Sequence, residues 1–401
     1  MICGWASIAG IVLTATLCGA CSPSRSLEAA RLGLDVASGV GGRTTAAPAG
    51  QRHPVVLAGQ SGDLYYPEAP PLAALLLIPG VTPAGRDDAR LVALAEALAR
   101  HGFLIFVPDL AGLRAQRVGP DDPASVTLAA DALATCFAPG VDPRFGLVAI
   151  SYAVAPAILA ALEPAHGGHI GLVVGVGGYH SAVAAITYLT TGYYRPAPGT
   201  PWRMGSPERI AKWLFLLASA SRVPAPADRD RLTAIAQARI EDAAADVAGL
   251  EAGLGASGRP LMVLIDNRDP DRVPELIAGL PSALRGDIEY LDLSRYNLKD
   301  LQASLLLIHG HDDPLIPPSE SVALAEAAPA GQAEVFIVSN LSHVEIHPGG
   351  IADTLALWRA AYRLLSFRED LTPPRLRSCA VDDGMGRSSE TGGLRLGRLL
   401  R

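Results

Sequence analysis

The chain alternates between short apolar runs and longer segments with leucines at helical spacing. Residues 73–78, 145–150 and 170–176 are continuous apolar runs, the pattern of strands buried on both faces of a sheet. Residues 87–100 place leucines on one face and predict a helix. The other expected strands are residues 103–107, 305–309 and 334–338, and the other expected helices are residues 124–136, 153–162, 321–328 and 351–365. Because strands that alternate with helices form βαβ units, the pattern predicts an α/β fold with a mostly parallel central sheet flanked by helices.

The regular alternation stops between residues 181 and 302. This segment is richer in helix-like stretches, and its expected helices are residues 209–218, 229–249 and 272–280. The strands on either side follow one sheet pattern, so residues 54–180 and 303–368 are expected to form a single core. Residues 54–58 and 63–66 are expected to begin that core as an antiparallel pair. Residues 181–302 are therefore predicted to be a helical cap inserted between core strands six and seven.

The two ends of the chain differ in composition from the core. Residues 1–21 contain no charged side chain and end in Cys18-Gly19-Ala20-Cys21, which resembles a bacterial lipoprotein signal. The protein is accordingly expected on the periplasmic side of the cell envelope, attached to the membrane by its N-terminus. An uncleaved anchor and a buried core helix are the alternatives. Residues 22–53 begin with helical spacing, become rich in Gly, Ala and Thr, and are predicted to be a linker. Residues 369–401 have no periodic pattern and are predicted to be a disordered tail.

Composition narrows the class of function. The 401 residues are 49% hydrophobic and 18% charged, which is typical of a folded chain. The net charge of −7 argues against a nucleic-acid partner, since phosphate binding needs clustered Lys and Arg. No Cys/His spacing typical of zinc is present, and the acidic run at residues 266–271 lacks the ligand order of a calcium loop, so no metal is expected. Three of the five cysteines lie in residues 1–21, and no disulfide framework is implied. The oligomeric state is left open.

Ser151 stands where the expected strand at residues 145–150 runs directly into a helix. A serine at that junction lies on a sharp turn with its hydroxyl exposed above the sheet. The turn crowds the positions two before and two after the serine, so both must be small, and here they are Ala149 and Ala153. Since a serine before a helix is often only an N-cap, the turn alone leaves both readings open.

An acid and a histidine follow the last two expected strands. Asp313 comes just after residues 305–309, where a carboxylate can orient a histidine and stabilise its charged ring. His343 comes just after residues 334–338, within reach of both the acid and the serine. Asp312 and His347 are the competing residues. His343 is preferred because it is nearer to the strand end. His309 and His311 are interpreted as turn and packing residues.

The order serine, acid, histidine, with one strand between acid and base, resembles that of the α/β hydrolases. The resemblance extends over residues 54–366, and Ile78-Pro79-Gly80-Val81 is similar to the loop after the third strand in that family. It implies an oxyanion hole formed by the backbone N–H groups of Val81 and Tyr152. It also implies Asp313 rather than Asp312 as the acid, because His309-Gly310, Asp313 and Ile316-Pro317 are similar to the acid turn of that family. The departure is alanine in place of glycine on both sides of Ser151.

The predicted function is that of a serine hydrolase which cleaves an ester or related acyl bond through Ser151, His343 and Asp313. No cofactor is expected, and the substrate is expected to be a small ester-like molecule. The candidate walls of the substrate site are Tyr179, Tyr193 and Tyr194, because aromatic side chains suit an apolar acyl or alcohol group. Two alternatives stay open: a non-catalytic ligand-binding protein on the same fold, and a serine peptidase.

Overall fold

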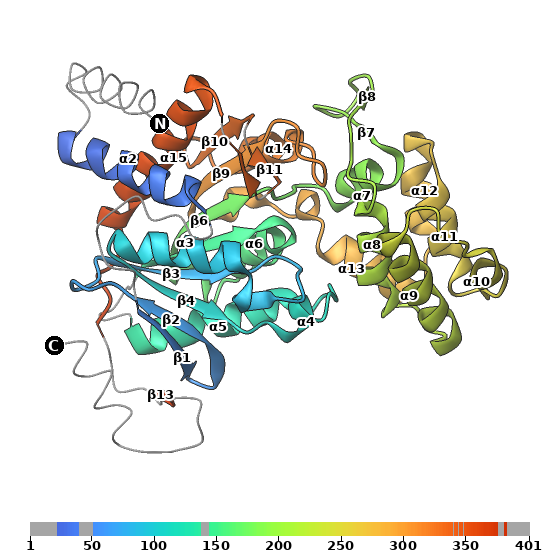
Figure 1. Cartoon of the computed structure of the whole chain (residues 1–401), viewed down its shortest axis with the longest axis horizontal. Helices are drawn as coiled ribbons and strands as arrows, with labels where there is room; N and C mark the ends of the chain where they lie inside the picture. Colours follow the sequence, from blue (N-terminus) through green and yellow to red (C-terminus); the bar gives the residue numbers. More distant parts are fainter. Residues whose placement is uncertain are drawn as a thin grey trace.

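The computed structural model describes residues 22–39, 51–137, 144–339, 341–343, 345–347, 349–375 and 381–382. Among these residues the centre of the molecule is a nine-stranded sheet in the order β10-β9-β6-β5-β3-β4-β2-β1-β13 (Figure 1). Its strands are β1 (Gln51–Leu57), β2 (Gln60–Tyr66), β3 (Ala73–Ile78), β4 (Phe103–Pro108), β5 (Phe145–Ile150), β6 (Ile170–Val176), β9 (Ser304–Gly310), β10 (Ala333–Val338) and β13 (Val381–Asp382).

The six central strands, from β4 to β10 in the sheet, are parallel, whereas β2, β1 and β13 continue the sheet with antiparallel pairings. All residues of β3 and β4 are buried, as their continuous apolar sequence predicted. Three strands begin and end at the residues predicted from their apolar runs: β3, β5 and β6. The strand order and the parallel centre confirm the predicted α/β-hydrolase fold.

Helices cover both faces of the sheet. On one face, α5 (Asp122–Phe137) and α6 (Val154–Leu162) pack against alternate residues of β5 such as Leu147. On the other face, α3 (Ala89–Arg100) and α15 (Ile351–Asp370) pack against the residues between, such as Val148. The side chains of a strand point alternately to its two faces, so one short run supplies both cores. Two further helices belong to this core, α4 (Ala111–Arg114) and α14 (Ser319–Ala327).

The chain leaves the sheet after β6 and returns at β9, and the segment between them is called the insertion below. It contains α7 (Ala182–Thr191), α8 (Ala211–Ala220), α9 (Pro226–Glu241), α10 (Ala248–Ala252), α11 (Arg259–Asp266), α12 (Val273–Ala278), α13 (Ser282–Tyr290) and the short pair β7 (Tyr193–Tyr194) and β8 (Arg203–Met204). Figure 1 shows these helices grouped beside the sheet.

One helix predicted within the insertion is wrong. The pattern at residues 229–249 predicted a single helix, but α9 ends at Glu241 and α10 starts at Ala248. Asp242 has an extended backbone and accepts a hydrogen bond from the backbone N–H of Ala244. Asp246 accepts one from Ala248. Short acidic side chains therefore satisfy the backbone outside the helix, which favours a break.

The predicted linker at residues 22–53 differs from the structure in its first part. Residues 23–37 form α2 (Pro23–Ala37), in which Leu32 is 2% exposed. Asp35 pairs with Arg100 of α3 at 3.0 Å between Oδ2 and Nε, and Arg368 of α15 pairs with Glu28. Because α2 is fixed to both α3 and α15, it is part of the core.

The ends of the chain are described only in part. The predicted signal at residues 1–21 lies outside the described residues. Among the helices that are described, none is both long and apolar enough to cross a bilayer. The predicted disordered tail, residues 369–401, is wrong for the residues that are described. α15 continues to Asp370, the N–H of Thr372 donates to Arg144 O at 2.9 Å, and residues 381–382 form β13 on the edge of the sheet. Residues 376–380 and 383–401 lie outside the described residues.

Cys136 corrects the expectation drawn from the cysteine count. It is fully buried in α5 and disulfide-bonded. The other cysteines of the sequence lie outside the described residues. A disulfide involving a core helix was not implied by the sequence spacing, because the pairing depends on which cysteine the fold brings near.

Candidate active site

Ser151 lies at the carboxyl end of β5, where the sheet edge meets the start of a helix. The backbone φ of Ser151 is +57°, which is rare for a residue other than glycine and is found at strained functional turns. A short 3₁₀ turn, Ser151–Ala153, leads from the strand into α6. Ala149 and Ala153 are both fully buried, so the small side chains on either side of the serine fill the crowded space that the turn leaves.

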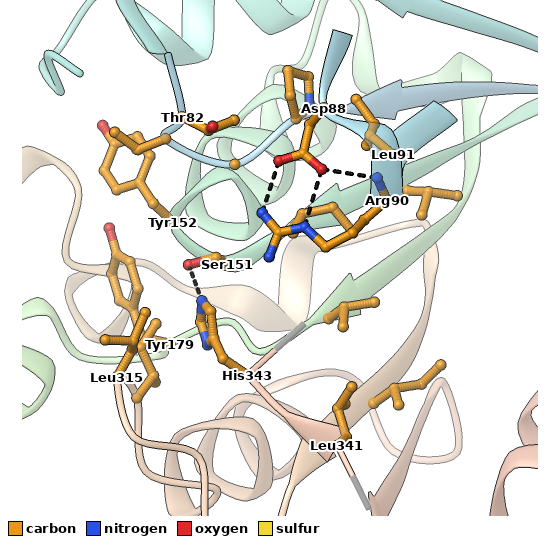
Figure 2. A pocket seen from close by; sticks show the side chains of 18 of the residues that line it. Thr82, Asp88, Arg90, Leu91, Ser151, Tyr152, Tyr179, Leu315, Leu341 and His343 are labelled. Atoms are coloured by element: carbon orange, nitrogen blue, oxygen red, sulfur yellow. Dashed lines mark hydrogen bonds and ion pairs between the residues drawn. The ribbon is translucent and has the colours of Figure 1, made fainter. Parts of the chain in front are cut away.

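The imidazole of His343 lies between the serine and an acid. Its Nε2 is 2.7 Å from Ser151 Oγ, and its Nδ1 is 2.9 Å from Asp313 Oδ2. Figure 2 shows the hydrogen bond between Ser151 and His343 beside the cavity. The backbone φ of His343 is +54°, so the turn after β11 (Leu341–Ser342) is also in a left-handed conformation. The structure thus brings Ser151, His343 and Asp313 together in one series of hydrogen bonds.

Asp313 is held as a carboxylate in a buried position. Its side chain is fully buried, and Oδ1 accepts hydrogen bonds from the backbone N–H groups of Leu315 at 2.8 Å and Ile316 at 3.0 Å. Burial is the largest influence and raises the pKa of Asp313, but hydrogen bonds from His309 and His343 outweigh it and hold that pKa well below its usual range. A permanently charged acid fixes the imidazole tautomer that leaves Nε2 facing the serine.

Asp312 and His347 are the competing residues, and neither has the contacts that Asp313 and His343 make with each other. The side chain of Asp312 is 85% exposed and contacts His311, with Nδ1 and Oδ1 2.8 Å apart. His347 is exposed. The structure therefore places the carboxylate of Asp313, and not that of its neighbour, against His343.

His309 has a closer relation to the acid than its sequence position indicated. Its side chain is fully buried, and Nε2 lies 2.9 Å from Ile316 O and 3.3 Å from Asp313 Oδ2. Its Nδ1 lies 2.7 Å from Ser321 Oγ. The sequence suggested a turn or packing residue. A proton on Nε2 of His309 can be shared between these two oxygens, so His309 supports the carboxylate of Asp313 together with His343.

The two predicted oxyanion donors lie next to the serine. The loop after β3 passes close to it, because a Cβ added to Gly80 would lie 3.5 Å from Ile150 O and 3.9 Å from Ser151 Cβ. Val81 and Tyr152 both line the cavity. The N–H of Tyr152 is in the first helical turn, where backbone donors have no partner inside the helix.

The phenol of Tyr152 points away from this chemistry. Its hydroxyl donates to Asp122 Oδ2 at 2.7 Å, and Asp122 also accepts from the N–H of Gly119 at 2.9 Å. Burial raises the pKa of Tyr152 well above its ordinary value, so the hydroxyl stays protonated as a donor. The bond ties the serine turn to α5.

Gly177, directly after β6, approaches the triad closely. Its φ is +63°, and an added Cβ would lie 3.2 Å from His343 Nδ1 and 3.4 Å from Asp313 Oδ2. Sequence reasoning did not single it out, because a glycine after a strand usually marks only a turn. Here it leaves the room that the imidazole needs.

Replacing Gly177 with alanine is expected to lower kcat for ester hydrolysis by about 10-fold or more, because a displaced imidazole loses its near-attack geometry. Gly192→Ala is the matched control: its φ is +81°, and an added Cβ would meet Pro207 at 3.6 Å, away from the triad. Both variants carry a similar backbone strain of about 1–2 kcal/mol. Equal kcat values for the two variants at matched stability would show that the crowding of His343 has no effect.

A cavity of about 860 Å³ opens beside Ser151 and His343. That volume lies in the range of small-molecule sites, and the lining is mostly apolar. Tyr179 lines it and is only 6% exposed. Tyr193 and Tyr194, the other two predicted walls, are not among the described lining residues. They form β7, where the ring of Tyr194 packs edge-on against Tyr188, whose hydroxyl donates to Asp313 O at 3.1 Å.

A buried carboxylate joins the core to the start of the insertion. Glu320 of α14 is 5% exposed, and its Oε2 accepts hydrogen bonds from the backbone N–H groups of His180 at 3.1 Å and Ser181 at 2.7 Å. Burial raises the pKa of Glu320 to about 7, with a further rise from the charge of Asp292, although the two N–H groups oppose the shift. The sequence held no signal for this contact, because α14 and residue 180 are far apart in the chain.

Glu320→Gln is expected to raise the free energy of unfolding at pH 8. An ordinary Glu has a pKa of about 4.3, so between about pH 4.3 and 7 the unfolded wild type has lost a proton that the fold retains. Stability of the wild type therefore falls as pH rises through this window, by an amount on the order of 3 kcal/mol. Glutamine can accept the same two bonds and does not titrate.

Urea unfolding at pH 5 and pH 8 measures this effect. The difference in the free energy of unfolding between Glu320→Gln and wild type is expected to shrink toward pH 5. Glu326→Gln, at an exposed position of the same helix, should have the same free energy of unfolding as wild type at both pH values. A Glu320→Gln protein that is less stable than wild type by the same amount at both pH values would refute the assignment.

In the part of the chain that the structure describes, no group of three or more His, Cys, Asp or Glu side chains could hold a metal ion. The acidic run around residue 269 starts a turn. Asp269 Oδ1 accepts a hydrogen bond from the backbone N–H of Asp271 at 3.0 Å, and Asn267 Oδ1 accepts one from the backbone N–H of Asp269 at 3.2 Å.

No protein-family model matches the sequence, and no curated protein is similar to it. Among solved structures, the chain is similar to a dienelactone hydrolase from Anabaena variabilis, at 15% identity over 79% of this chain and 99% of that chain, with a TM-score of 0.40. It is similar to an α/β-hydrolase fold protein from Nakamurella multipartita, at 16% identity over 80% and 100% of the two chains, with a TM-score of 0.38. A dipeptidyl peptidase 4 from Porphyromonas gingivalis matches at 13% identity over 81% and 36%, with a TM-score of 0.41.

Proposed function

Because the chain has the α/β-hydrolase fold, we propose that it is a serine hydrolase that cleaves an ester or related acyl bond. The observation that carries this proposal is the unbroken series of hydrogen bonds from Ser151 Oγ through His343 to Asp313, at 2.7 Å and 2.9 Å. A hydroxyl in contact with an oriented imidazole is an activated nucleophile. The series ends beside a cavity of about 860 Å³, which gives an acyl substrate room to reach the hydroxyl.

The reaction begins when His343 Nε2 accepts the proton of Ser151 Oγ as the oxygen bonds to the carbonyl carbon of the ester. The carbonyl oxygen takes the negative charge, which the backbone N–H groups of Val81 and Tyr152 stabilise. The bond to the alcohol then breaks, and the alcohol leaves with the proton held by His343. Water adds to the acyl group by the same steps and releases the acid. Each lost oxyanion donor typically raises the barrier by about 3 kcal/mol.

Asp313 keeps the imidazole oriented during both steps. Its low pKa keeps it charged, and this charge stabilises the imidazolium that forms when Ser151 gives up its proton. His309 and the N–H groups of Leu315 and Ile316 fix the carboxylate so that one edge faces His343.

The apolar lining of the cavity favours an ester over a peptide as substrate, because burying a peptide group without partners is costly. A direct test compares p-nitrophenyl butyrate with butyryl p-nitroanilide, which share the acyl group and differ in the bond cleaved. We expect turnover of the ester and much slower turnover of the anilide. Binding of the ester without release of p-nitrophenol would favour the non-catalytic alternative, and faster cleavage of the anilide would favour a peptidase.

We also propose that the protein works outside the cytoplasm. The uncharged residues 1–21 that end in Cys21 support this, as does the disulfide at Cys136, because disulfides persist in oxidising compartments. The mass of the protein purified from its native membrane fraction tests the lipid anchor: a chain that starts at a lipidated Cys21 is expected, and an unmodified chain that starts at Met1 would contradict it.

A further inference from the structure

The residues that line the cavity at Ser151 fall into two sets, which belong to different parts of the fold. One set of lining residues belongs to α7, α8 and α13 of the insertion, for example Ile186, Phe215 and Ile288. The other set belongs to the opposite side of the molecule, where Val148, Val174 and Leu306 of the sheet face α3, α15 and α2. We call the first the insertion arm and the second the sheet arm.

The sheet arm is a space inside the core. The alternate residues of β5, Leu147 and Ala149, pack on the other face with α5 and α6, so Val148 and Ile150 point to the face that α3 and α15 cover. A strand exposes only every second residue to each face. The arm therefore runs between the sheet and these two helices, and Leu32, Gly33 and Val36 of α2 line it as well.

The length of the sheet arm can be estimated along α3. Leu91, Leu94 and Leu98 all line it, and at about 1.5 Å of rise per residue the seven steps from the first to the last span about 10 Å. Two lipid chains fill the hydrocarbon core of a bilayer, about 30 Å thick, so one chain is about 15 Å long. The arm can hold about two thirds of such a chain.

Polar groups are concentrated where the two arms meet. Ser151 and His343 lie there, and so does the ion pair of Asp88 with Arg90, with 2.7 Å between Oδ2 and Nη2. Figure 2 shows this pair and Leu91 on one side of Ser151, with His343 on the other. An ester group suits the junction, while both arms suit hydrocarbon.

On the basis of the hydrolase function proposed above, we propose that the sheet arm binds the acyl chain of a fatty-acyl ester. The alcohol leaves with the proton of His343, so it lies on the His343 side of Ser151, toward the insertion arm. The acyl chain then extends to the other side, past Leu91 and along α3. The substrate class is an ester whose acid has about 8 to 12 carbons within the arm, as its length of about 10 Å allows.

α2 is held against this arm through contacts that are mostly buried. Arg100 and Asp35 are 4% and 0% exposed in their side chains, and Trp358 Nε1 donates to Ser26 O at 3.0 Å. Within α2, a larger side chain can be placed at Gly33, because nothing lies within 4 Å of an added Cβ. Leucine is also a better helix former than glycine, so Gly33→Leu is expected to fold.

The first experiment measures kcat/KM for p-nitrophenyl acetate, octanoate and dodecanoate. Each buried methylene is expected to favour binding by about fourfold, so wild type should prefer dodecanoate to acetate by at least about 100-fold. Gly33→Leu should reduce that preference by about 10-fold or more with little change for acetate. The matched control is Gly286→Leu, since Gly286 is an exposed helical glycine of α13 with nothing within 4 Å of an added Cβ.

The second experiment measures binding without catalysis. Dodecanoate should bind to Ser151→Ala in calorimetry, and the added Gly33→Leu should weaken that binding by about 10-fold. In the insertion arm, Ala185→Leu should leave the acyl-length preference unchanged. A loss of the preference in Ala185→Leu but not in Gly33→Leu would overturn the assignment of the arms.

The two experiments separate this proposal from the function on which it rests. Hydrolysis of the p-nitrophenyl esters of acetate and dodecanoate at equal rates, together with no binding of dodecanoate, would overturn the acyl-chain role of the sheet arm. The serine hydrolase function would still stand. Binding of dodecanoate that depends on Gly33, with no ester hydrolysed at any chain length, would overturn the hydrolase and leave a chain-binding arm.

Discussion

Ser151→Ala is expected to lower kcat for p-nitrophenyl butyrate by about 10⁴- to 10⁶-fold. The substitution removes only the oxygen that lies 2.7 Å from His343 Nε2. Catalysis by the oxyanion donors alone would remain. Because the hydroxyl acts in the chemical step and contributes little to substrate binding, KM should change far less than kcat.

The control for this variant is Ser125→Ala. Ser125 donates its hydroxyl proton to Asp121 O at 2.9 Å in the first turn of α5 and does not line the cavity. The Ser125→Ala variant should keep kcat within about twofold of the wild-type value, as expected for a surface change. A melting temperature of Ser151→Ala close to that of wild type would show that the loss is chemical. Activity of Ser151→Ala above one tenth of wild type would remove Ser151 from the mechanism.

Asp313→Asn is expected to lower kcat by about 10⁴-fold, since an amide facing His343 Nδ1 stabilises the wrong tautomer of the ring. The side-chain oxygen of asparagine can still accept hydrogen bonds from the N–H groups of Leu315 and Ile316, so the turn at residues 313–316 is expected to persist. The neighbouring carboxylate offers a close control. Asp312→Asn changes an 85% exposed group that pairs with His311, and it should leave kcat within about twofold of the wild-type value.

The stability of the two variants, Asp313→Asn and Asp312→Asn, gives a second measurement that distinguishes them. The pKa of Asp313 is depressed in the fold, so its contribution to stability is present above its unfolded value, about pH 3.9, and is lost as pH falls through the folded value. Asp313→Asn should therefore be less stable than wild type at pH 7, with a smaller difference near pH 3. If Asp312→Asn were the inactive variant instead, the acid would have been assigned to the wrong residue.

The core strands were predictable because burial on both faces leaves a continuous apolar run. On that basis both ends of three strands, residues 73–78, 145–150 and 170–176, could be predicted without error. Helix ends were less certain, because a cap depends on one side chain: α3 starts at Ala89, after Asp88 accepts from the N–H of Arg90, and not at residue 87. Three helices of the insertion, α7, α11 and α13, were not predicted.

The convergence of Ser151, Asp313 and His343 followed from the sheet. The three residues come after parallel strands, whose carboxyl ends lie on one edge, so their approach could be expected from strand order alone. Tyr193 and Tyr194 had no such constraint, and they lie in β7, where Tyr194 packs on Tyr188.

The supporting contacts could not be predicted. The approach of Gly177 to His343 and the bonds of Glu320 to residues 180 and 181 depend on how elements pack in three dimensions. The same holds for α2. Its spacing indicated a helix, but nothing in the sequence indicated that Leu32 and Val36 would line a cavity reaching Ser151.

The nucleophile is tested most directly by a fluorophosphonate probe, followed by the intact mass and peptide mapping of the native protein. We predict one phosphonyl group per chain, on Ser151, with none after heat denaturation. A native protein that stays unlabelled, or an adduct on another side chain while Ser151 is unmodified, would contradict the account.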